Sequence, residues 1–274
     1  MLLPRLLTAV IGIPVILIAI KFGGIPYLVL VTGIILFALN EYFFLLKYGK
    51  YNAHPVPAYV MSVMLLSSIY ISGAKLIPAM DGFSTSVVFS AGLILFFLFE
   101  IITGNPRGSM GRIGVSVFGV FAVCWTLSHL LLIRDMRPKG EYYTYYLFFL
   151  IWIVDTAAYG FGMKLGRHRL AEKISPKKSI EGAIGGFLTG IIVSILLRQI
   201  FGLYEFTVSE IAIVGLFITA LAYLSDLAES LIKRDVGLKD SDVLLPGHGG
   251  ILDRFDSFLL TAPLFYYYLM IFRK

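Results

Sequence analysis

The sequence contains little charge and almost no cysteine. Charged residues make up 15% of its 274 residues, hydrophobic residues make up 58%, and the mean hydropathy is +0.86. A soluble domain of this composition would expose large adhesive patches. The composition therefore excludes an ordinary soluble protein and predicts an integral membrane protein. The single cysteine, Cys124, excludes an intramolecular disulfide, and its surroundings VFAVCWTL indicate apolar packing.

Acidic residues are also fewer than basic ones. The chain has 17 Asp and Glu against 23 Lys and Arg, a net charge of +6 and a pI near 9.3. In a soluble protein this excess would favour nucleic-acid binding. Here the basic residues lie between apolar runs, which is typical of cytoplasmic loops and of sites for anionic lipids or nucleotides. We expect the lipid bilayer as a partner and no nucleic acid.

Apolar segments of about 20 residues, the length needed to cross a bilayer, recur along the whole chain. Nine are predicted to be transmembrane helices, at 4–21, 25–46, 57–74, 84–103, 113–133, 143–163, 180–201, 208–231 and 256–272. The pattern predicts an all-α polytopic membrane protein. Only Arg5 stands before the apolar run of the first segment and no small-residue cleavage site follows it, so we expect a membrane helix and not a signal peptide.

The basic residues predict the orientation. With the N-terminus in the cytoplasm, 15 of the 23 Lys and Arg face that side, which favours a cytoplasmic N-terminus and an external C-terminus. The loop RDMRPKGE, from residue 134, opposes this assignment. The two most basic loops, 164–178 and 233–254, then face the cytoplasm together. We expect residues 1–110 to form a lipid-facing scaffold and residues 111–274 to carry a cytoplasm-facing catalytic site.

One segment, residues 230–256 (SLIKRDVGLKDSDVLLPGHGGILDRFD), concentrates charge between two apolar runs. Four basic residues, five aspartates, a histidine and a Gly-Gly pair are the parts needed to hold a metal and a polyphosphate. The glycines allow backbone close to a ligand. Asp253 and Asp256 bracket Arg254, and oxygen ligands of this kind favour Mg²⁺.

Just upstream, Asp226, Glu229, Ser230 and Lys233 have helical spacing and share one face. A carboxylate in a membrane helix is costly and usually faces a cavity or a partner. Two interpretations remain open. Asp226 or Glu229 forms an ion pair with Lys233, or Asp226 is a metal ligand with Lys233 and Arg234 as phosphate clamps.

A second polar block lies near the end of the sixth apolar segment. Asp155 and Tyr159 are one turn apart, and SPKKS (residues 175–179) precedes a glycine-rich helix start. A cap at Ser175 or Ser179 and a helix N-terminus would favour phosphate. The alternatives are a polar helix contact and a solvated basic loop. We expect only the solvated loop for Lys164, Arg167, His168 and Arg169, and interhelical contacts for Glu41 and Glu100, with cavity lining as a second option for Glu41.

These residues form a recognisable pattern. SLIKR (230–234), then Lys239 and Asp240, then PGHGGILDRFD (246–256) closely resembles the signature of phosphatidate cytidylyltransferases, also called CDP-diacylglycerol synthases. The block 155–186 is similar to the same family, and Arg5, Thr8 and Glu41 match less specifically. The resemblance covers the chain and is strongest from about residue 150. One position departs, because Asp242 stands where the family usually has a small residue.

The resemblance implies a reaction of CTP with phosphatidic acid that gives CDP-diacylglycerol and pyrophosphate. It implies Asp226 and Asp253 as Mg²⁺ ligands, with a second cation and a homodimer left open. Phosphate-binding roles are implied for Lys233, Arg234, Lys239 and Arg254, orienting roles for Asp240 and Asp256, and a phosphate or turn-ordering role for His248. Further substrate-binding residues are Asp155, Tyr159, Ser175, Lys177, Lys178, Ser230, Gly249 and Gly250.

Three other functions were weighed. A CTP-dependent polyprenol or lipid kinase would transfer the γ-phosphate, and the complete PGHGGILDRFD block argues against it. A CDP-alcohol phosphotransferase needs an arrangement of Asp, Gly and Arg that this sequence lacks. A cation-coupled transporter using Asp226, Asp155 and Glu41 would show inverted repeats, and none is visible. The compact chain is typical of prokaryotic forms in the cytoplasmic membrane.

Overall fold

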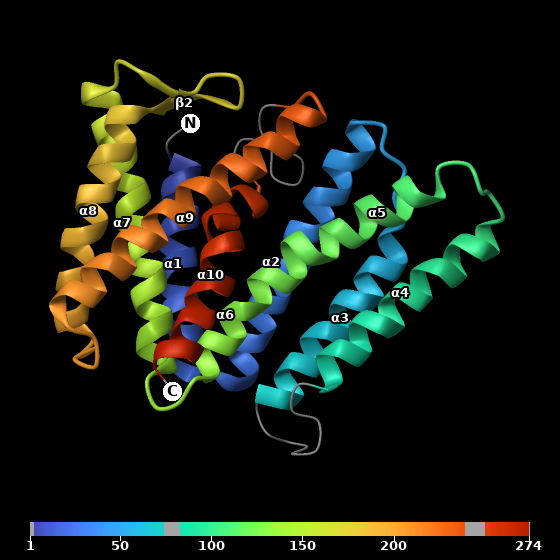
Figure 1. Cartoon of the computed structure of the whole chain (residues 1–274), viewed down its shortest axis with the longest axis horizontal. Coiled ribbons are helices and arrows are strands. Elements are labelled where there is room, and N and C mark those ends of the chain that lie inside the picture. Colours follow the sequence, from blue (N-terminus) through green and yellow to red (C-terminus); the bar gives the residue numbers. More distant parts are fainter. Residues whose placement is uncertain (1–2, 74–82, 239–249, 274) are drawn as a thin grey trace.

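The protein is a bundle of long apolar helices (Figure 1), seen in a computed structural model that describes residues 3–73, 83–238 and 250–273. Within these residues the helices are α1 (Leu3–Phe22), α2 (Gly24–Tyr48), α3 (Pro55–Gly73), α4 (Phe83–Thr103), α5 (Ser109–Gly119), α6 (Thr126–Asp135), α7 (Gly140–Leu165), α8 (Ile180–Ile200), α9 (Val208–Asp235) and α10 (Leu252–Phe272). A π-helical segment, Val120–Trp125, joins α5 to α6, so that Ser109–Asp135 forms one continuous span.

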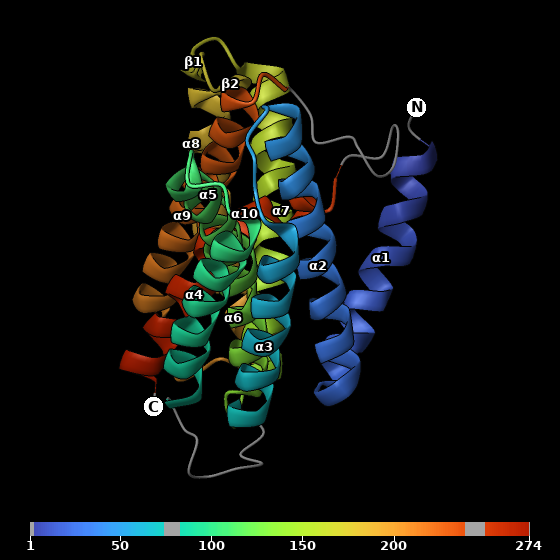
Figure 2. The ribbon, with the colours of Figure 1, turned by 90° about the vertical axis from the view of Figure 1, so that its right-hand side faces the viewer.

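The helix positions confirm the predicted apolar segments. Among the described residues, eight segments are long and apolar enough to cross a membrane, and α1 adds a shorter apolar stretch, Val10–Phe22. The protein is therefore an integral membrane protein with multiple apolar helices. Both views place the start of α1 and the end of α10 at opposite ends of the bundle (Figures 1 and 2), which is the arrangement that the nine predicted spans require. Which end faces the cytoplasm stays a prediction, as does the division at residue 110.

The expectation of a purely helical chain needs one correction. A two-stranded antiparallel hairpin, β1 (Arg169–Ala171) and β2 (Ser175–Ser179), lies between α7 and α8 and pairs Arg169 with Ser179. The sequence of this hairpin is polar and lacks the alternation of apolar residues that predicts a strand, so it was expected to be a loop. The end of the bundle that carries β1 and β2 is called the hairpin end below.

Close helix contacts hold α8 against α9. A Cβ atom added at Gly190 would lie 2.2 Å from Thr219 Oγ1, and one added at Gly215 would lie 2.4 Å from Ser194 Cβ. Small residues let membrane helices approach closely, because packing rather than the hydrophobic effect holds them together in lipid. This contact fixes the start of α8, and the hairpin before it, over the same helix that carries Asp226.

Local partners hold two cations of the basic loop (residues 134–141) at the end of the bundle opposite the hairpin. Lys139 Nζ lies 2.6 Å from both the Glu205 carboxylate and the Gly202 carbonyl oxygen. Arg134 donates hydrogen bonds to the carbonyl oxygens of Ile20 and Lys21. These cations join the ends of helices to one another, which is a structural reason for the loop to be basic.

Candidate active site

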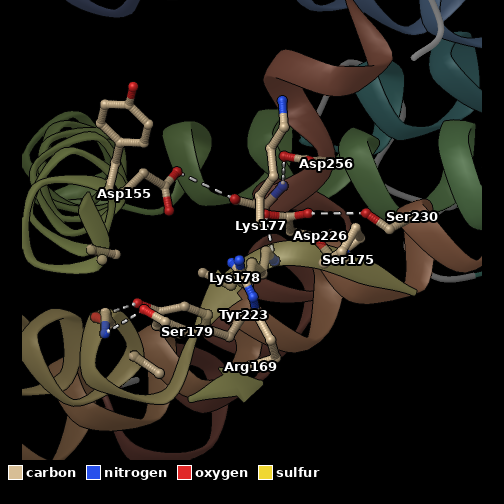
Figure 3. Close-up of a pocket in the computed structure, with 18 of the residues that line it drawn as sticks. Asp155, Arg169, Ser175, Lys177, Lys178, Ser179, Tyr223, Asp226, Ser230 and Asp256 are labelled. Carbon is tan, nitrogen blue, oxygen red and sulfur yellow. Dashed lines mark hydrogen bonds and ion pairs between the residues drawn. The ribbon is translucent and has the colours of Figure 1, made fainter. Parts of the chain in front are cut away.

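A cavity of about 630 Å³ lies at the hairpin end of the bundle. Side chains of α7, β1, β2, α8, α9 and α10 line it (Figure 3). The two charged sequence blocks, near residues 155–186 and 226–256, therefore both contribute described residues to the lining of one cavity. The helix packing described above brings them together across a large separation in sequence.

Carboxylates from three different helices face this cavity. They are Asp155 of α7, Asp226 of α9 and Asp256 of α10. Ser257 Oγ donates a 3.3 Å hydrogen bond to Asp155 Oδ2, and Ser230 Oγ lies 3.4 Å from Asp226 Oδ1. Such a concentration of like charge needs cations nearby, because uncompensated buried carboxylates are costly in a poorly solvated site.

Lys178 of β2 supplies the first of these cations. Its Nζ lies 2.6 Å from Asp226 Oδ2 and 5.7 Å above the centre of the Tyr223 ring. The hairpin is anchored just beyond, since Ser179 Oγ accepts a 3.1 Å hydrogen bond from the amide of Gly182 and caps α8. The predicted cap at Ser179 is thus confirmed, and the N-terminus of α8 meets the cavity through Gly182.

Lys233 connects two acidic residues at another wall. Its Nζ lies 2.6 Å from Glu229 Oε2 and 2.9 Å from Asp253 Oδ1, while the Glu229 side chain is only 1% exposed. The ion pair of Lys233 with Glu229, one of the two interpretations left open by the sequence, is present. In this arrangement Lys233 joins α9 to α10 and orients the Asp253 carboxylate.

Arg234 holds the hairpin loop against the end of α9. Its Nε donates to the carbonyl oxygen of Ile174 and its Nη1 donates to that of Leu238, both at 3.0 Å. The side chain also lines the cavity. Arg234 therefore fixes the wall of the cavity through backbone contacts.

Glu41 of α2 fixes the start of α10. Its two carboxylate oxygens accept hydrogen bonds of 2.8 Å and 2.7 Å from the amides of Ile251 and Leu252, and the residue is 2% exposed. A carboxylate suits a helix N-terminus because free amides and the helix dipole both favour negative charge there. The expected interhelical contact of Glu41 is confirmed, and it positions the helical turn that carries Asp253 and Asp256.

Comparison with known proteins identifies the family of this chain. The sequence model of the cytidylyltransferase family matches residues 3–272. The chain belongs to the cytidylyltransferase family. The phosphatidate cytidylyltransferase of Bacillus subtilis (strain 168) is 31% identical over 271 residues, which cover 98% of this chain and 97% of the relative. That of Staphylococcus aureus (strain COL) is 33% identical over 264 residues, covering 95% and 96%. The resemblance drawn from the motifs is confirmed along the full length.

Most of the candidate residues that the structure describes line the cavity. Besides the residues above they include Tyr159, Ser175, Lys177, Ser230 and Asp253. Arg254 is exposed and lies outside the lining of the cavity in the part of the chain that the structure describes. The Gly250 amide lies 3.4 Å from Asp253 Oδ2. Lys239, Asp240, Asp242, His248 and Gly249 lie outside the described residues.

Sequence reasoning missed two contributors to the site, Arg169 and Ser257. Arg169 lines the cavity although it was expected to belong to a solvated loop. Ser257 binds Asp155. Glu229 binds Lys233, and the helical spacing of these two residues did indicate their pairing. Nothing in the sequence indicated the direction of Arg169, because that depends on a hairpin that was not expected.

The cavity offers the oxygen donors that Mg²⁺ prefers. Within the described ranges no three Asp, Glu, His or Cys side chains already form a metal-binding group. Mg²⁺ is usually held by one or two carboxylates, with water and substrate phosphate completing its octahedron. Asp155, Asp226, Asp253 and Asp256, all at the cavity wall, therefore fit Mg²⁺ by their chemistry.

Proposed function

We propose that this membrane protein transfers the cytidylyl group of CTP to phosphatidate, giving CDP-diacylglycerol and pyrophosphate. The observation that carries the proposal is the cavity where Lys178 meets Asp226. It lies in a chain similar to phosphatidate cytidylyltransferases over almost its entire length. A site of carboxylates and lysines at the end of a membrane bundle suits a lipid phosphate and a nucleotide arriving from water.

The reaction requires positioning more than proton transfer. An oxygen of the lipid phosphate attacks the α-phosphorus of CTP, the bond to the bridging oxygen breaks, and that oxygen leaves with pyrophosphate. The attacking group is already anionic, so no general base is needed. The difficulty is to bring two anions together and to stabilise the charge that develops on the leaving group.

The residues of the cavity address both difficulties. Lys177 and Lys178 reduce the repulsion between the two substrates, and the N-terminus of α8 adds the favourable dipole of that helix. Lys233 and Glu41 hold Asp253 and Asp256 at the cavity wall. Asp226 and Asp253 would hold Mg²⁺, with Asp155 and Asp256 beside them. When bound, the ion supplies positive charge for the phosphate oxygens and the leaving group.

The proposal also includes a direction in the membrane. The basic residues favour placing the hairpin end in the cytoplasm, which for a bacterial protein means the inner face of the cytoplasmic membrane. A cysteine at position 173, in a Cys124→Ala background, should then react with a membrane-impermeant maleimide only in inside-out vesicles. Reaction in right-side-out vesicles would reverse the assigned direction.

Radioactive CTP tests the reaction itself. Purified protein is incubated with phosphatidate, Mg²⁺ and CTP labelled at either the α- or the γ-phosphate. Label from the α-phosphate should enter the lipid, and label from the γ-phosphate should appear in pyrophosphate. The Asp226→Asn variant, compared at equal amounts of folded protein, should form little labelled lipid. Entry of the γ-label into lipid would refute the proposal and indicate a lipid kinase.

A further inference from the structure

The cations that line the cavity fall into two groups. Lys178 and Lys233 are paired with carboxylates, and Arg234 donates to backbone carbonyl oxygens. Arg169 and Lys177 also line the cavity, yet neither has a carboxylate partner among the described residues. Two full positive charges thus stand at the cavity wall without a local counter-charge in the part of the chain that the structure describes.

These two residues belong to the same hairpin. Arg169 lies in β1 opposite Ser179 of β2, and Lys177 is two positions before Ser179 on that strand. Both side chains are exposed, whereas Lys178 is half-buried against Asp226. In Figure 3 the Lys177 side chain extends past Asp226 and Asp256, and Arg169 lies on the other side of Lys178. The hairpin therefore presents two exposed cations at the wall of the cavity.

The chemistry of the pair matches a diphosphate. The guanidinium of Arg169 offers a planar fork of N–H donors that suits two phosphate oxygens, and the ammonium of Lys177 adds a compact charge. Of the groups in the proposed reaction, the β- and γ-phosphates carry the most negative charge. They also leave for water, whereas the lipid phosphate stays tethered to acyl chains on the membrane side.

We propose that Arg169 and Lys177 bind the β- and γ-phosphates of CTP, which depart as pyrophosphate. The inference rests on the proposed function. As the bond between the α-phosphorus and the bridging oxygen breaks, its electron pair moves to that oxygen. Arg169 and Lys177 donate hydrogen bonds to the departing group and transfer no proton. Lys178, which is held deeper by Asp226, binds the α-phosphate and the lipid phosphate.

Three alanine variants test the assignment. Arg169→Ala and Lys177→Ala should each raise the KM for CTP and the inhibition constant for pyrophosphate about tenfold or more, the loss expected for charge-assisted hydrogen bonds. The KM for phosphatidate and the inhibition constant for CMP, which lacks the two outer phosphates, should change less than about twofold. Lys173→Ala removes a charge from the same hairpin away from the cavity lining and should leave all four constants unchanged.

Arg169→Lys separates geometry from charge. It keeps the charge but loses the bidentate fork, so its pyrophosphate inhibition constant should lie between those of the wild type and Arg169→Ala. An unchanged pyrophosphate constant in Arg169→Ala would refute the inference. A rise in the KM for phosphatidate alone would also refute it, and would assign the pair to the lipid phosphate.

Direct binding distinguishes this inference from the proposed function. Calorimetric titration of pyrophosphate with Mg²⁺ into the detergent-solubilised protein needs no turnover. Weaker binding in Arg169→Ala than in Lys173→Ala supports the diphosphate site even if the wild type forms no CDP-diacylglycerol, which would refute only the proposed function. Equal binding in both variants overturns the site whatever the activity. Elution of each variant as a single peak in size-exclusion chromatography confirms that it is folded.

Discussion

Lys178 Nζ lies 2.6 Å from Asp226 Oδ2, which joins the hairpin to α9 at the wall of the cavity. The lysine side chain is 17% exposed and the aspartate side chain 33%, so water screens the pair only in part. Each residue limits where the other can point. The relationship makes β2 a part of the site and not a solvated connection between α7 and α8.

Lys178→Ala should lower the rate of CDP-diacylglycerol formation at limiting CTP and phosphatidate by about tenfold or more, because it removes a charge that faces both substrates. It also leaves Asp226 without its nearest cation. The double variant with Asp226→Asn should therefore lose less than the sum of the two single losses, with a coupling of about 0.5–3 kcal/mol. Strictly additive losses would mean that the two residues act independently. An unchanged rate in Lys178→Ala would show that Lys178 belongs to a solvated loop with no role in the reaction.

Asp253→Asn should abolish activity while the protein remains folded and extractable. The amide keeps the size of the side chain but loses the charge that Lys233 contacts and that a cation requires. Raising the Mg²⁺ concentration should restore little of the rate. Asp135→Asn, at the other end of the bundle, serves as the matched control. Near-normal turnover of Asp253→Asn would eliminate this residue as a metal ligand.

Removing Lys233 should destabilise the protein because Glu229 would be left as an uncompensated charge at 1% exposure. Breaking a buried pair costs about 3–5 kcal/mol, whereas replacing both partners costs much less. Lys233→Met should therefore lower the thermal unfolding temperature in detergent more than the double variant Glu229→Gln, Lys233→Met. Equal losses in the two proteins would show that Glu229 does not depend on Lys233.

Glu41→Gln should weaken both the start of α10 and the reaction. A glutamine side chain presents one acceptor and one donor to the amides of Ile251 and Leu252, which need two acceptors. We expect a loss of about 1–3 kcal/mol in unfolding free energy and a lower kcat with a smaller change in KM, since Asp253 and Asp256 would be displaced. Glu141→Gln, on α7 at the opposite end, is the control. A normal kcat in Glu41→Gln would show that Glu41 is not needed to position Asp253 and Asp256.

The location of the site was predictable to a large extent. Helical spacing placed Asp226 and Lys233 on one face, and Ser179 was one of the two residues predicted as a cap. The partners of these residues were harder to predict. Lys233, for which a phosphate-binding role was implied, bridges Glu229 and Asp253, and Asp226 pairs with Lys178. Which of these ion pairs form depends on the distances between segments that lie far apart in sequence.

The sequence by itself determined that the chain is a membrane bundle, where its apolar segments lie and which family its charged motifs resemble. Those features follow from hydropathy and local spacing, which act within one helix at a time. Only the tertiary structure decided that a hairpin carries Arg169 to the cavity and that Glu41 fixes the start of α10. The reason is physical, because side-chain direction depends on the pairing of strands and the packing of helices, neither of which is a local property.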